Sequence, residues 1–291
     1  MTYDVVIFGI KMTLKPIAFS IPLGSGHWDV YWYGILIALG FLLAVIFGVK
    51  NAKRFGIAVD PMLDVVLVVT PVAILCARAY YVIFDGQKLN SIGEFFGFGE
   101  SSGFSGIAIY GGVIGAFVSG ALMCKLRKIK ITDMFDLASL GFLIGQGIGR
   151  WGNFVNQEAF GSLTGSSWWG MQSQNTIAAL GEGMVHPCFL YESVWCIAGF
   201  FIINHLSKQR KFSGETFLMY CAWYGFGRGF IEILRTDSLM LGNIKVSCFL
   251  AFALCFASVI LIAVIRKRIT PKEEYISVFT ENTEEENVQD N

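Results

Sequence analysis

The sequence has 291 residues, of which 54% are hydrophobic and only 15% are charged. Soluble globular domains usually carry about 25% charged residues, so the composition excludes a disordered chain and an ordinary soluble enzyme. Lysine and arginine together number 22, as do aspartate and glutamate, and the net charge is zero. A chain without net positive charge is not a basic nucleic-acid-binding domain. We therefore expect an integral membrane protein with no nucleic-acid partner.

Seven segments are apolar enough to be predicted as membrane-spanning helices. A helix needs about 20 apolar residues to cross a bilayer, and unpaired strands cannot face lipid. Three of the segments contain no charge and four contain one or two ionisable residues. In chain order they are Val30–Val49, Val65–Phe84, Ile107–Cys124, Met134–Gly149, Cys188–Leu206, Thr216–Ile233 and Val246–Ile265. The expected fold class is all-α integral membrane, with seven transmembrane helices.

The loops between these segments predict an orientation. Fourteen Lys and Arg residues fall on one side of the membrane and six on the other. Since basic residues are enriched in cytoplasmic loops, the N-terminus is expected outside the cell and the C-terminus in the cytoplasm. Residues 1–29 would then be an extracytoplasmic segment, residues 30–265 the membrane domain, with an outer cap loop at 150–187, and residues 266–291 a cytoplasmic tail that is basic and then acidic.

The cysteines and histidines predict no metal site and no cofactor. Seven cysteines are scattered without a CxxC pair, and the three histidines lack metal-ligand spacing. His27 and His205 are expected at the membrane surfaces. His186 precedes Pro187 at a helix entrance, where a catalytic role and a purely structural capping role are equally open.

Ionisable residues accompany the second, fourth and sixth spans. One such residue at the bilayer centre costs about 2.5–3.5 kcal/mol on insertion scales. Either these residues pair and lock helices together, or they line a polar cavity, and their number favours the cavity. The residues are Arg78, Arg150, Glu158, Arg228, Glu232 and Arg235.

Four arginines against two carboxylates predict a positively charged cavity. A guanidinium donates two parallel hydrogen bonds to phosphate and never deprotonates, so the cavity suits a phospholipid head group. Two alternatives stay open. Arg228 and Glu232 are four residues apart on one helical face and can pair with each other, and Arg235 can extend to water at the outer interface.

The densest polar stretch is Gly149–Gly161, with the sequence GRWGNFVNQEAFG. It follows directly on an uncharged run and offers a cation, two amides and a carboxylate. Just before it, Gly141, Gly145 and Gly149 recur every four residues, a spacing typical of close helix packing.

This stretch resembles the signature of the prolipoprotein diacylglyceryl transferase family, which reads Gly-Arg-x-Gly-Asn-Phe-x-Asn-x-Glu-x-x-Gly. All eight fixed positions are filled here, from Gly149 to Gly161. Further family elements occur in order along the chain, and the resemblance covers about Tyr31 to Asp237. These elements are Trp32-Tyr33-Gly34, Arg78 with Tyr80-Tyr81, His186-Pro187 with Tyr191-Glu192, and Tyr224, Arg228, Glu232 and Arg235-x-Asp237.

The resemblance implies a multi-pass enzyme of the bacterial cytoplasmic membrane that performs the first step of lipoprotein maturation. The diacylglyceryl group of phosphatidylglycerol would pass to the thiol of a lipobox cysteine in a prolipoprotein, forming a thioether and releasing glycerol phosphate. The nucleophile belongs to the substrate, so no cysteine of this chain is required.

On this reading the membrane domain is catalytic, and we expect Arg150 and Arg228 to clamp the lipid phosphate. Asn153 and Glu158 would orient the head group or the incoming thiol. The candidate bases, in no order, are Glu158, Tyr110 and His186. The remaining candidate contacts with phosphatidylglycerol are Tyr33, Arg78, Asn156, Tyr224 and Glu232.

One position departs from the family pattern. Many members carry His-Gly-Gly in the third span, where this chain has Tyr110-Gly111-Gly112. Because the pKa of an unperturbed tyrosine is ~10, Tyr110 would be a poor base at neutral pH, although it can donate a hydrogen bond. Two other functions compete with the transferase: a transporter or channel for an anionic solute, and a structural membrane protein whose charges only pair helices.

Overall fold

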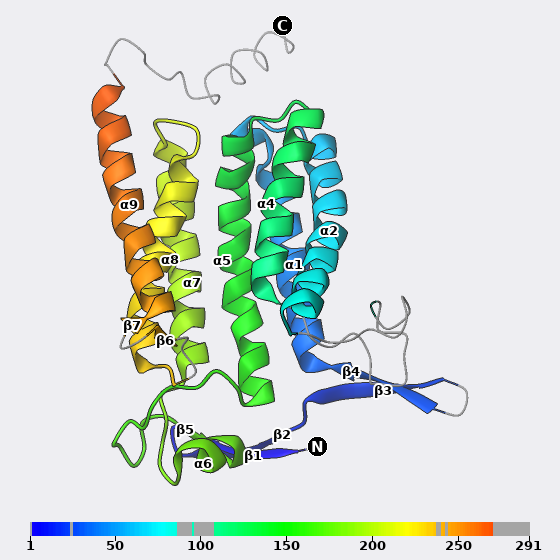
Figure 1. The fold of residues 1–291 in the computed structure, drawn as a ribbon, viewed down its shortest axis with the longest axis vertical. Coiled ribbons are helices and arrows are strands. Elements are labelled where there is room, and N and C mark those ends of the chain that lie inside the picture. Colours follow the sequence, from blue (N-terminus) through cyan, green and yellow to red (C-terminus); the bar gives the residue numbers. More distant parts are fainter. Residues whose placement is uncertain are drawn as a thin grey trace, which may run out of the picture. The chain divides into compact units, whose positions relative to one another are not determined.

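The computed structural model describes residues 2–23, 26–85, 95, 108–236, 240–241 and 244–269. They belong to two compact units, Met1–Gly48 with Phe135–Asn291, and Val49–Met134. Long helices make up most of each unit (Figure 1). Asp237 and the acidic part of the tail, both named in the sequence predictions, lie outside the described residues.

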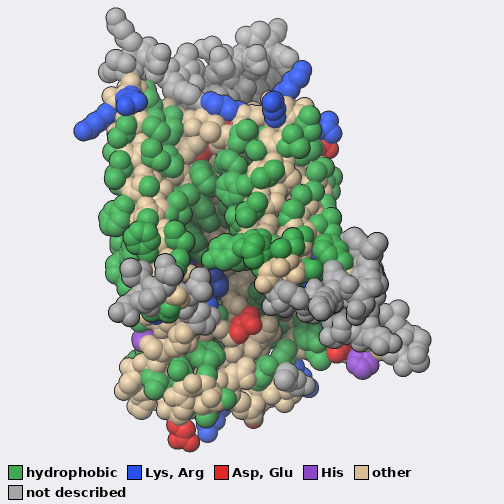
Figure 2. All heavy atoms as spheres, in the orientation of Figure 1, with side chains coloured by type: hydrophobic (Ala, Val, Ile, Leu, Met, Phe, Trp, Pro, Cys, Tyr) green, Lys and Arg blue, Asp and Glu red, His purple; other side chains and the backbone are tan. Residues whose placement is uncertain are grey.

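The first unit contains the polar stretch Gly149–Gly161, which begins near the end of one of its long helices. In chain order the long helices are α1 (Trp32–Asn51), α5 (Ile131–Asn156), α7 (Cys188–Leu206), α8 (Glu215–Leu234) and α9 (Val246–Arg268). Figure 2 shows hydrophobic side chains along the exposed side of α9 and basic side chains at its C-terminal end. That distribution is typical of a helix that crosses a membrane and ends in the basic loop region on one side.

In the second unit, the described residues form two long helices, α2 (Val59–Asp85) and α4 (Ile109–Leu126), preceded by a 3-10 turn at Lys53–Phe55. Two glycines of α4 bring the helices into backbone contact. A Cβ atom on Gly111 would lie 2.4 Å from the Cys76 carbonyl oxygen, and one on Gly115 would lie 2.6 Å from the Cys76 Cβ. Any larger side chain at either position would force the two helices apart.

Each of the seven predicted spans overlaps one of these long helices. Among the described residues, five of the helices are long and apolar enough to cross a membrane, namely α1, α2, α4, α7 and α9. Helices α5 and α8 are absent from that set because their polar and charged residues, among them Asp136, Arg150, Arg228 and Glu232, make them less apolar. The chain is thus a mostly helical, multi-pass membrane protein.

The part of the chain that the structure describes also contains seven short strands, none of which is predicted from the sequence. They are β1 (Tyr3–Ile7), β2 (Ile10–Leu14), β3 (Ile17–Leu23), β4 (Gly26–Tyr31), β5 (Met171–Ser173), β6 (Met240–Leu241) and β7 (Ile244–Lys245). They pair in three antiparallel sheets, ordered β2-β1-β5, β3-β4 and β6-β7. These short strands accompany a fold that is mostly helical, as expected.

The sheet β2-β1-β5 and the short helix α6 (Gln174–Leu180) form a folded cap on the ends of α5 and α7. Its core includes Val5, Met171 and Val185, which pack with Phe154 of α5 and Phe189 of α7. The expected cap loop at 150–187 is therefore folded, but its first seven residues continue α5. The helix ends where Gln157 adopts a positive φ of 54°, which a helix cannot continue.

The glycines of α5 pack against α1, as their spacing predicts. A Cβ on Gly40 of α1 would lie 3.2 Å from the Cα of Gly145, and one on Gly141 would lie 3.4 Å from the Cβ of Ala44. A Cβ on Gly149 would meet nothing within 4 Å. The close approach is therefore at Gly40, which lies on the backbone of Gly145, and Gly141 makes an ordinary contact, whereas a Cβ on Gly145 would, like one on Gly149, meet nothing within 4 Å.

A second polar cluster fixes the N-terminal end of α8. Asp136 of α5 is fully buried. Its Oδ2 accepts hydrogen bonds from Arg210 at 2.6 Å and from the Gly214 backbone N–H at 2.8 Å, and its Oδ1 accepts one from the Phe217 N–H at 2.8 Å. The carboxylate thereby caps the unpaired N–H groups of the first turn of α8 from a neighbouring helix.

Candidate functional site

The candidate site is built around Glu192, in the second turn of α7. Its side chain is buried, with 1% of its surface exposed. Oε1 accepts hydrogen bonds from Arg150 at 2.5 Å and from the Tyr224 hydroxyl at 2.9 Å, and Oε2 accepts one from Arg228 at 3.0 Å. A carboxylate in an apolar span needs such partners, because an unpaired buried charge is very costly.

The site contains a second buried carboxylate, Glu232, which lies one turn after Arg228 on α8. Arg228 forms an ion pair with it through its other terminal nitrogen, and Arg235 Nε lies 3.9 Å from the same carboxylate oxygen. Lys245 donates to the carbonyls of Glu232, Ile233 and Arg235 at 2.7–3.0 Å. The local pairing of Arg228 with Glu232 is confirmed, and Arg228 also bridges to Glu192.

These pairs change the expected charge of the site. Arg150, Arg228, Arg235 and Lys245 stand against the carboxylates of Glu192, Glu232 and Glu158, so 4 − 3 leaves one excess positive charge. The sequence predicts a positively charged cavity from a count that omits Glu192 and Lys245. The arginines are not sealed inside the protein: the side chains of Arg150 and Arg228 keep 23% and 18% of their surface exposed.

The signature stretch extends this cluster toward the cap. Arg150 donates to Asn153 Oδ1 at 3.3 Å, and Asn153 Nδ2 donates to Glu158 Oε1 at 2.8 Å. Glu158 is exposed, unlike Glu192. Asn156 is half-buried at the end of α5. A line of hydrogen bonds therefore connects the buried carboxylate, through a guanidinium and an amide, to a carboxylate at the surface.

Tyr33 joins the same cluster from α1. Its ring lies on the backbone of Gly152, where a Cβ would come within 2.0 Å of the ring. The phenol is close enough to interact electrostatically with Glu158 and Arg150. Gly152 of the signature is thus explained as the space that Tyr33 occupies.

His186 lies in the cap, in a separate hydrogen-bonded group. Its Nδ1 is 3.2 Å from the Tyr191 hydroxyl, which accepts a hydrogen bond from the Trp169 indole at 3.1 Å. Burial lowers the pKa of His186 below its usual value, because it disfavours the charged imidazolium. The imidazole is therefore neutral at pH 7 and can accept a proton.

Arg78 and Tyr110 belong to the second unit. Arg78 is buried in α2, where its Nε donates to the Phe95 carbonyl at 3.2 Å and its guanidinium lies 5.8 Å from the centroid of the Tyr81 ring. Tyr110 lies in the first turn of α4 and is exposed.

In the first unit, the structure brings together six of the predicted site residues, with Tyr33 beside them. They are Arg150, Asn153, Glu158, Tyr224, Arg228 and Glu232.

Glu192 is not among the site residues predicted from the sequence. The signal is present, since Glu192 is the one Asp, Glu, Lys or Arg residue inside its predicted span, and such a residue marks a functional site by default. Among the described residues, no group of three His, Cys, Asp or Glu side chains could hold a metal ion.

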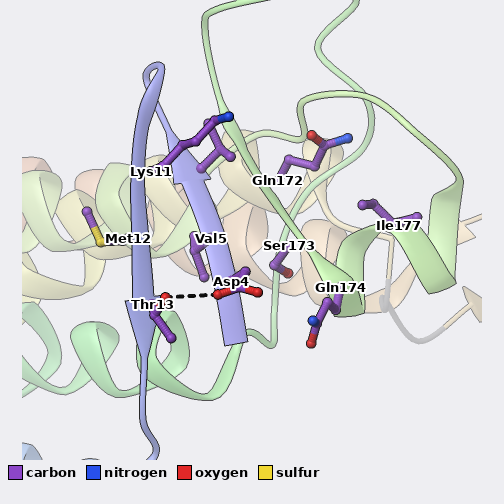
Figure 3. A pocket seen from close by; sticks show the side chains of 10 residues that line it. Asp4, Val5, Lys11, Met12, Thr13, Gln172, Ser173, Gln174 and Ile177 are labelled. Atoms are coloured by element: carbon purple, nitrogen blue, oxygen red, sulfur yellow. Dashed lines mark hydrogen bonds between the residues drawn. The ribbon is translucent and has the colours of Figure 1, made fainter. Parts of the chain in front are cut away.

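A cavity of about 370 Å³ lies elsewhere, on the cap (Figure 3). Figure 3 shows it between the β1–β2 hairpin, with Asp4, Lys11 and Thr13, and the segment that carries Gln172 and Ile177. The Thr13 hydroxyl donates to Asp4 at 2.9 Å within it. Its side chains are not those of the Glu192 cluster, so the cavity is separate from the arginine site.

The fold and the site together define a class of protein. This is a multi-pass membrane protein in which two arginines are paired with one buried carboxylate. These residues lie at the same end of the helices as the folded cap. The model of the prolipoprotein diacylglyceryl transferase family matches residues 16–264. The chain belongs to this family.

Curated relatives agree over most of the chain. A phosphatidylglycerol–prolipoprotein diacylglyceryl transferase of Limosilactobacillus reuteri (strain DSM 20016) is 40% identical over 266 residues, covering 89% of this chain and 94% of the relative. Proteins of the same name from Bacillus cytotoxicus and Clostridioides difficile (strain 630) are each 39% identical, over 257 and 224 residues. They cover 86% and 75% of this chain, and 93% and 84% of those relatives.

Proposed function

We propose that this chain transfers the diacylglyceryl group of phosphatidylglycerol to the lipobox cysteine of prolipoproteins, and that the Glu192 cluster binds the lipid phosphate. The names of the relatives supply the two substrates. The observation that carries the choice of site is that Arg150 and Arg228 donate to the same buried carboxylate. Two guanidinium groups are thereby held side by side among apolar helices.

Glu192 has a defined task in this proposal. Two adjacent arginines would repel each other in a water-poor site, and the carboxylate between them offsets that repulsion. Each guanidinium has five N–H groups and uses only some of them on Glu192. The partly exposed edges of Arg150 and Arg228 then donate to the phosphate oxygens. The single excess positive charge compensates the phosphodiester.

The reaction needs a stabilised leaving group and a deprotonated nucleophile. The substrate thiol, with an ordinary pKa of ~8.5, loses its proton to a base, and its sulfur forms a bond to the glyceryl carbon that bears the phosphate. The bond between that carbon and the phosphate oxygen breaks, and glycerol phosphate leaves with the electron pair. Arg150 and Arg228 would stabilise the developing charge on the phosphate.

Glu158 is the base that the geometry favours. It is exposed, and it is connected to the arginines through Asn153, so a thiol arriving from the aqueous side could meet it beside the phosphate. Tyr224 would hold Glu192 in place, and Glu232 would hold Arg228. Tyr33 and Asn156 would contact the head group. Arg78 would belong to the lipid site. Tyr110 would donate a hydrogen bond to the lipid, and His186 remains the alternative base.

The proposed topology has seven crossings of the bacterial cytoplasmic membrane, with the N-terminus and the cap outside. Helices α5 and α8 would cross as well as the five apolar helices, because their buried charges are neutralised: Arg150 and Arg228 pair with Glu192 of α7, Asp136 pairs with Arg210, and Glu232 pairs with Arg228. The basic side chains at the C-terminal end of α9 would then lie in the cytoplasm, as expected for an interior loop region.

The test is a transfer assay with phosphatidylglycerol labelled in its acyl chains and a synthetic lipobox peptide. We expect Arg150→Lys and Arg150→Ala to lower the rate of transfer by about 10²–10³-fold, because a single ammonium cannot replace the bidentate guanidinium. Arg127→Lys is the matched control, since Arg127 forms an exposed ion pair with Asp64 and should keep full activity. Transfer by Arg150→Ala at the rate of the unchanged protein would remove Arg150 from the site.

A further inference from the structure

The hairpin of β3 and β4 has two chemically different faces. Ile21 lies opposite Trp28, and Ser20 lies opposite Asp29. Because opposed residues share a face and faces alternate along a strand, the register assigns the side chains of residues 19–22 and 27–30 to faces. One face carries Phe19, Ile21, Trp28 and Val30, and the other carries Ser20, Pro22, His27 and Asp29.

The apolar face is open, whereas the polar face is internally paired. Phe19, Ile21 and Trp28 keep 53%, 40% and 65% of their surface exposed. On the other face the Ser20 hydroxyl donates to Asp29 at 2.5 Å, and His27 Nε2 lies 3.7 Å from the same carboxylate oxygen. An isolated two-stranded hairpin is at best marginally stable in water, so an apolar face of this size needs apolar surroundings.

The position of the hairpin indicates what those surroundings are. Tyr31, the last residue of β4, is followed directly by Trp32, the first residue of α1, and the Trp32 N–H donates to the Pro16 carbonyl at 2.9 Å. Helix α1 has 20 residues, which at 1.5 Å per residue span about 30 Å, the thickness of the hydrocarbon core. The hairpin therefore begins where the hydrocarbon ends.

The direction of the hairpin fits the same location. Figure 1 shows β3 and β4 running across the axis of α1 and not continuing it. When α1 crosses the bilayer, the hairpin consequently extends along the membrane surface. Tryptophan is enriched at this depth, because its ring is amphipathic.

We infer that the apolar face of the β3–β4 hairpin is a membrane-contact surface, with Phe19, Ile21 and Trp28 immersed in the interfacial region of the leaflet at which α1 begins. The occupant of this face is lipid, and Ser20, His27 and Asp29 face water. The inference goes beyond the transferase activity and depends only on α1 crossing the bilayer.

The experiment compares two neighbouring positions on opposite faces. Trp28→Cys and Asp29→Cys are each labelled with a nitroxide in the full chain, reconstituted into phosphatidylglycerol-containing vesicles, and collisions with oxygen and with a water-soluble nickel chelate are measured. The unsubstituted protein, treated in parallel, gives the background from the native cysteines, of which Cys124, Cys188, Cys196, Cys221 and Cys255 are buried. Retention of the thermal unfolding midpoint shows that each labelled protein is folded.

We expect the label at 28 to collide severalfold more often with oxygen than with the chelate, and the label at 29 to show the reverse. Equal chelate access at both positions would overturn the inference. So would a label at 28 that is shielded from both reagents, because protein would then cover the face. The pair Phe19→Cys and Ser20→Cys repeats the comparison on the other strand and decides it if the tryptophan cannot be replaced.

Discussion

Trp195 of α7 and Trp223 of α8 donate their indole N–H groups to each other's backbone carbonyls, at 2.9 and 3.0 Å. Their rings are stacked with centroids 4.3 Å apart. Each ring occupies the space that a glycine of the opposite helix leaves open: Trp195 lies on Gly227 and Trp223 on Gly199. This reciprocal pair joins the two helices next to Glu192, Tyr224 and Arg228.

The pair makes Gly227 intolerant of a side chain. A Cβ there would lie 2.2 Å from the Trp195 indole nitrogen, so Gly227→Ala should separate α7 from α8 and cost about 1–3 kcal/mol through overpacking. Thermal unfolding in detergent measures the loss, and near-UV circular dichroism should show a weaker signal from the stacked indoles. Gly34→Ala is the control, because its Cβ would meet nothing within 4 Å; equal midpoints for the two variants would contradict the prediction.

Replacement of Glu192 by glutamine tests the buried carboxylate itself. The change keeps the shape but removes the carboxylate that Arg150 and Arg228 share, so that Arg228 keeps only its pair with Glu232, and breaking a buried pair costs about 3–5 kcal/mol. We expect a lower unfolding midpoint together with loss of transfer activity. Glu158→Gln is the comparison: Glu158 is exposed, so we expect it to lose activity and keep its midpoint. An unchanged midpoint in Glu192→Gln would show that the arginines do not depend on the carboxylate.

Asp136 should be a purely structural counterpart. It accepts three hydrogen bonds from the segment that begins α8, and Asp136→Asn removes the charge opposite Arg210. The expected cost is again about 3–5 kcal/mol. Asp64→Asn breaks only the exposed pair with Arg127 and should cost at most about 1 kcal/mol. Denaturant titration of both variants measures the difference, and similar values for the two would refute the assignment.

His186 gives the folded protein a dependence on pH. Its pKa is lowered in the folded state, so below pH ~6.5 the unfolded chain binds a proton that the folded chain resists. The free energy of unfolding should therefore be fully retained above pH 6.5 and should decrease as the pH falls below it. His186→Gln should flatten this decrease. Unfolding midpoints between pH 8 and pH 5 provide the measurement, and identical slopes for both proteins would exclude His186 as the source.

The helices are predictable from the sequence because the bilayer imposes a length and a polarity that every span must satisfy. The boundaries of α2 and α5 are less predictable. Val59–Asp85 and Ile131–Asn156 both extend past the predicted apolar segments by polar turns, which hydropathy cannot distinguish from loops. The strands are short, and the turn between β1 and β2 uses Phe8 and Gly9, both with positive φ. Of the two, only the glycine is a recognisable turn residue.

The site is predictable only where its contacts are local. The Arg228–Glu232 pair follows from a spacing of four residues on one helix. Glu192 lies 42 residues from Arg150 and 36 from Arg228, and no periodicity connects them. The family signature identifies which residues matter, whereas the bridge between the two arginines depends on how α5, α7 and α8 pack.

The contact between α8 and α9 restricts how a lipid can travel. A Cβ on Gly225 would lie 2.6 Å from the Ala251 carbonyl oxygen, and one on Gly229 would lie 2.6 Å from the Phe252 ring. Two helices this close leave no slot for an acyl chain. In the proposed function, a phospholipid diffusing in the plane of the bilayer would have to reach Arg150 and Arg228 away from the contact between α8 and α9, and its product would have to leave by a route that avoids this contact.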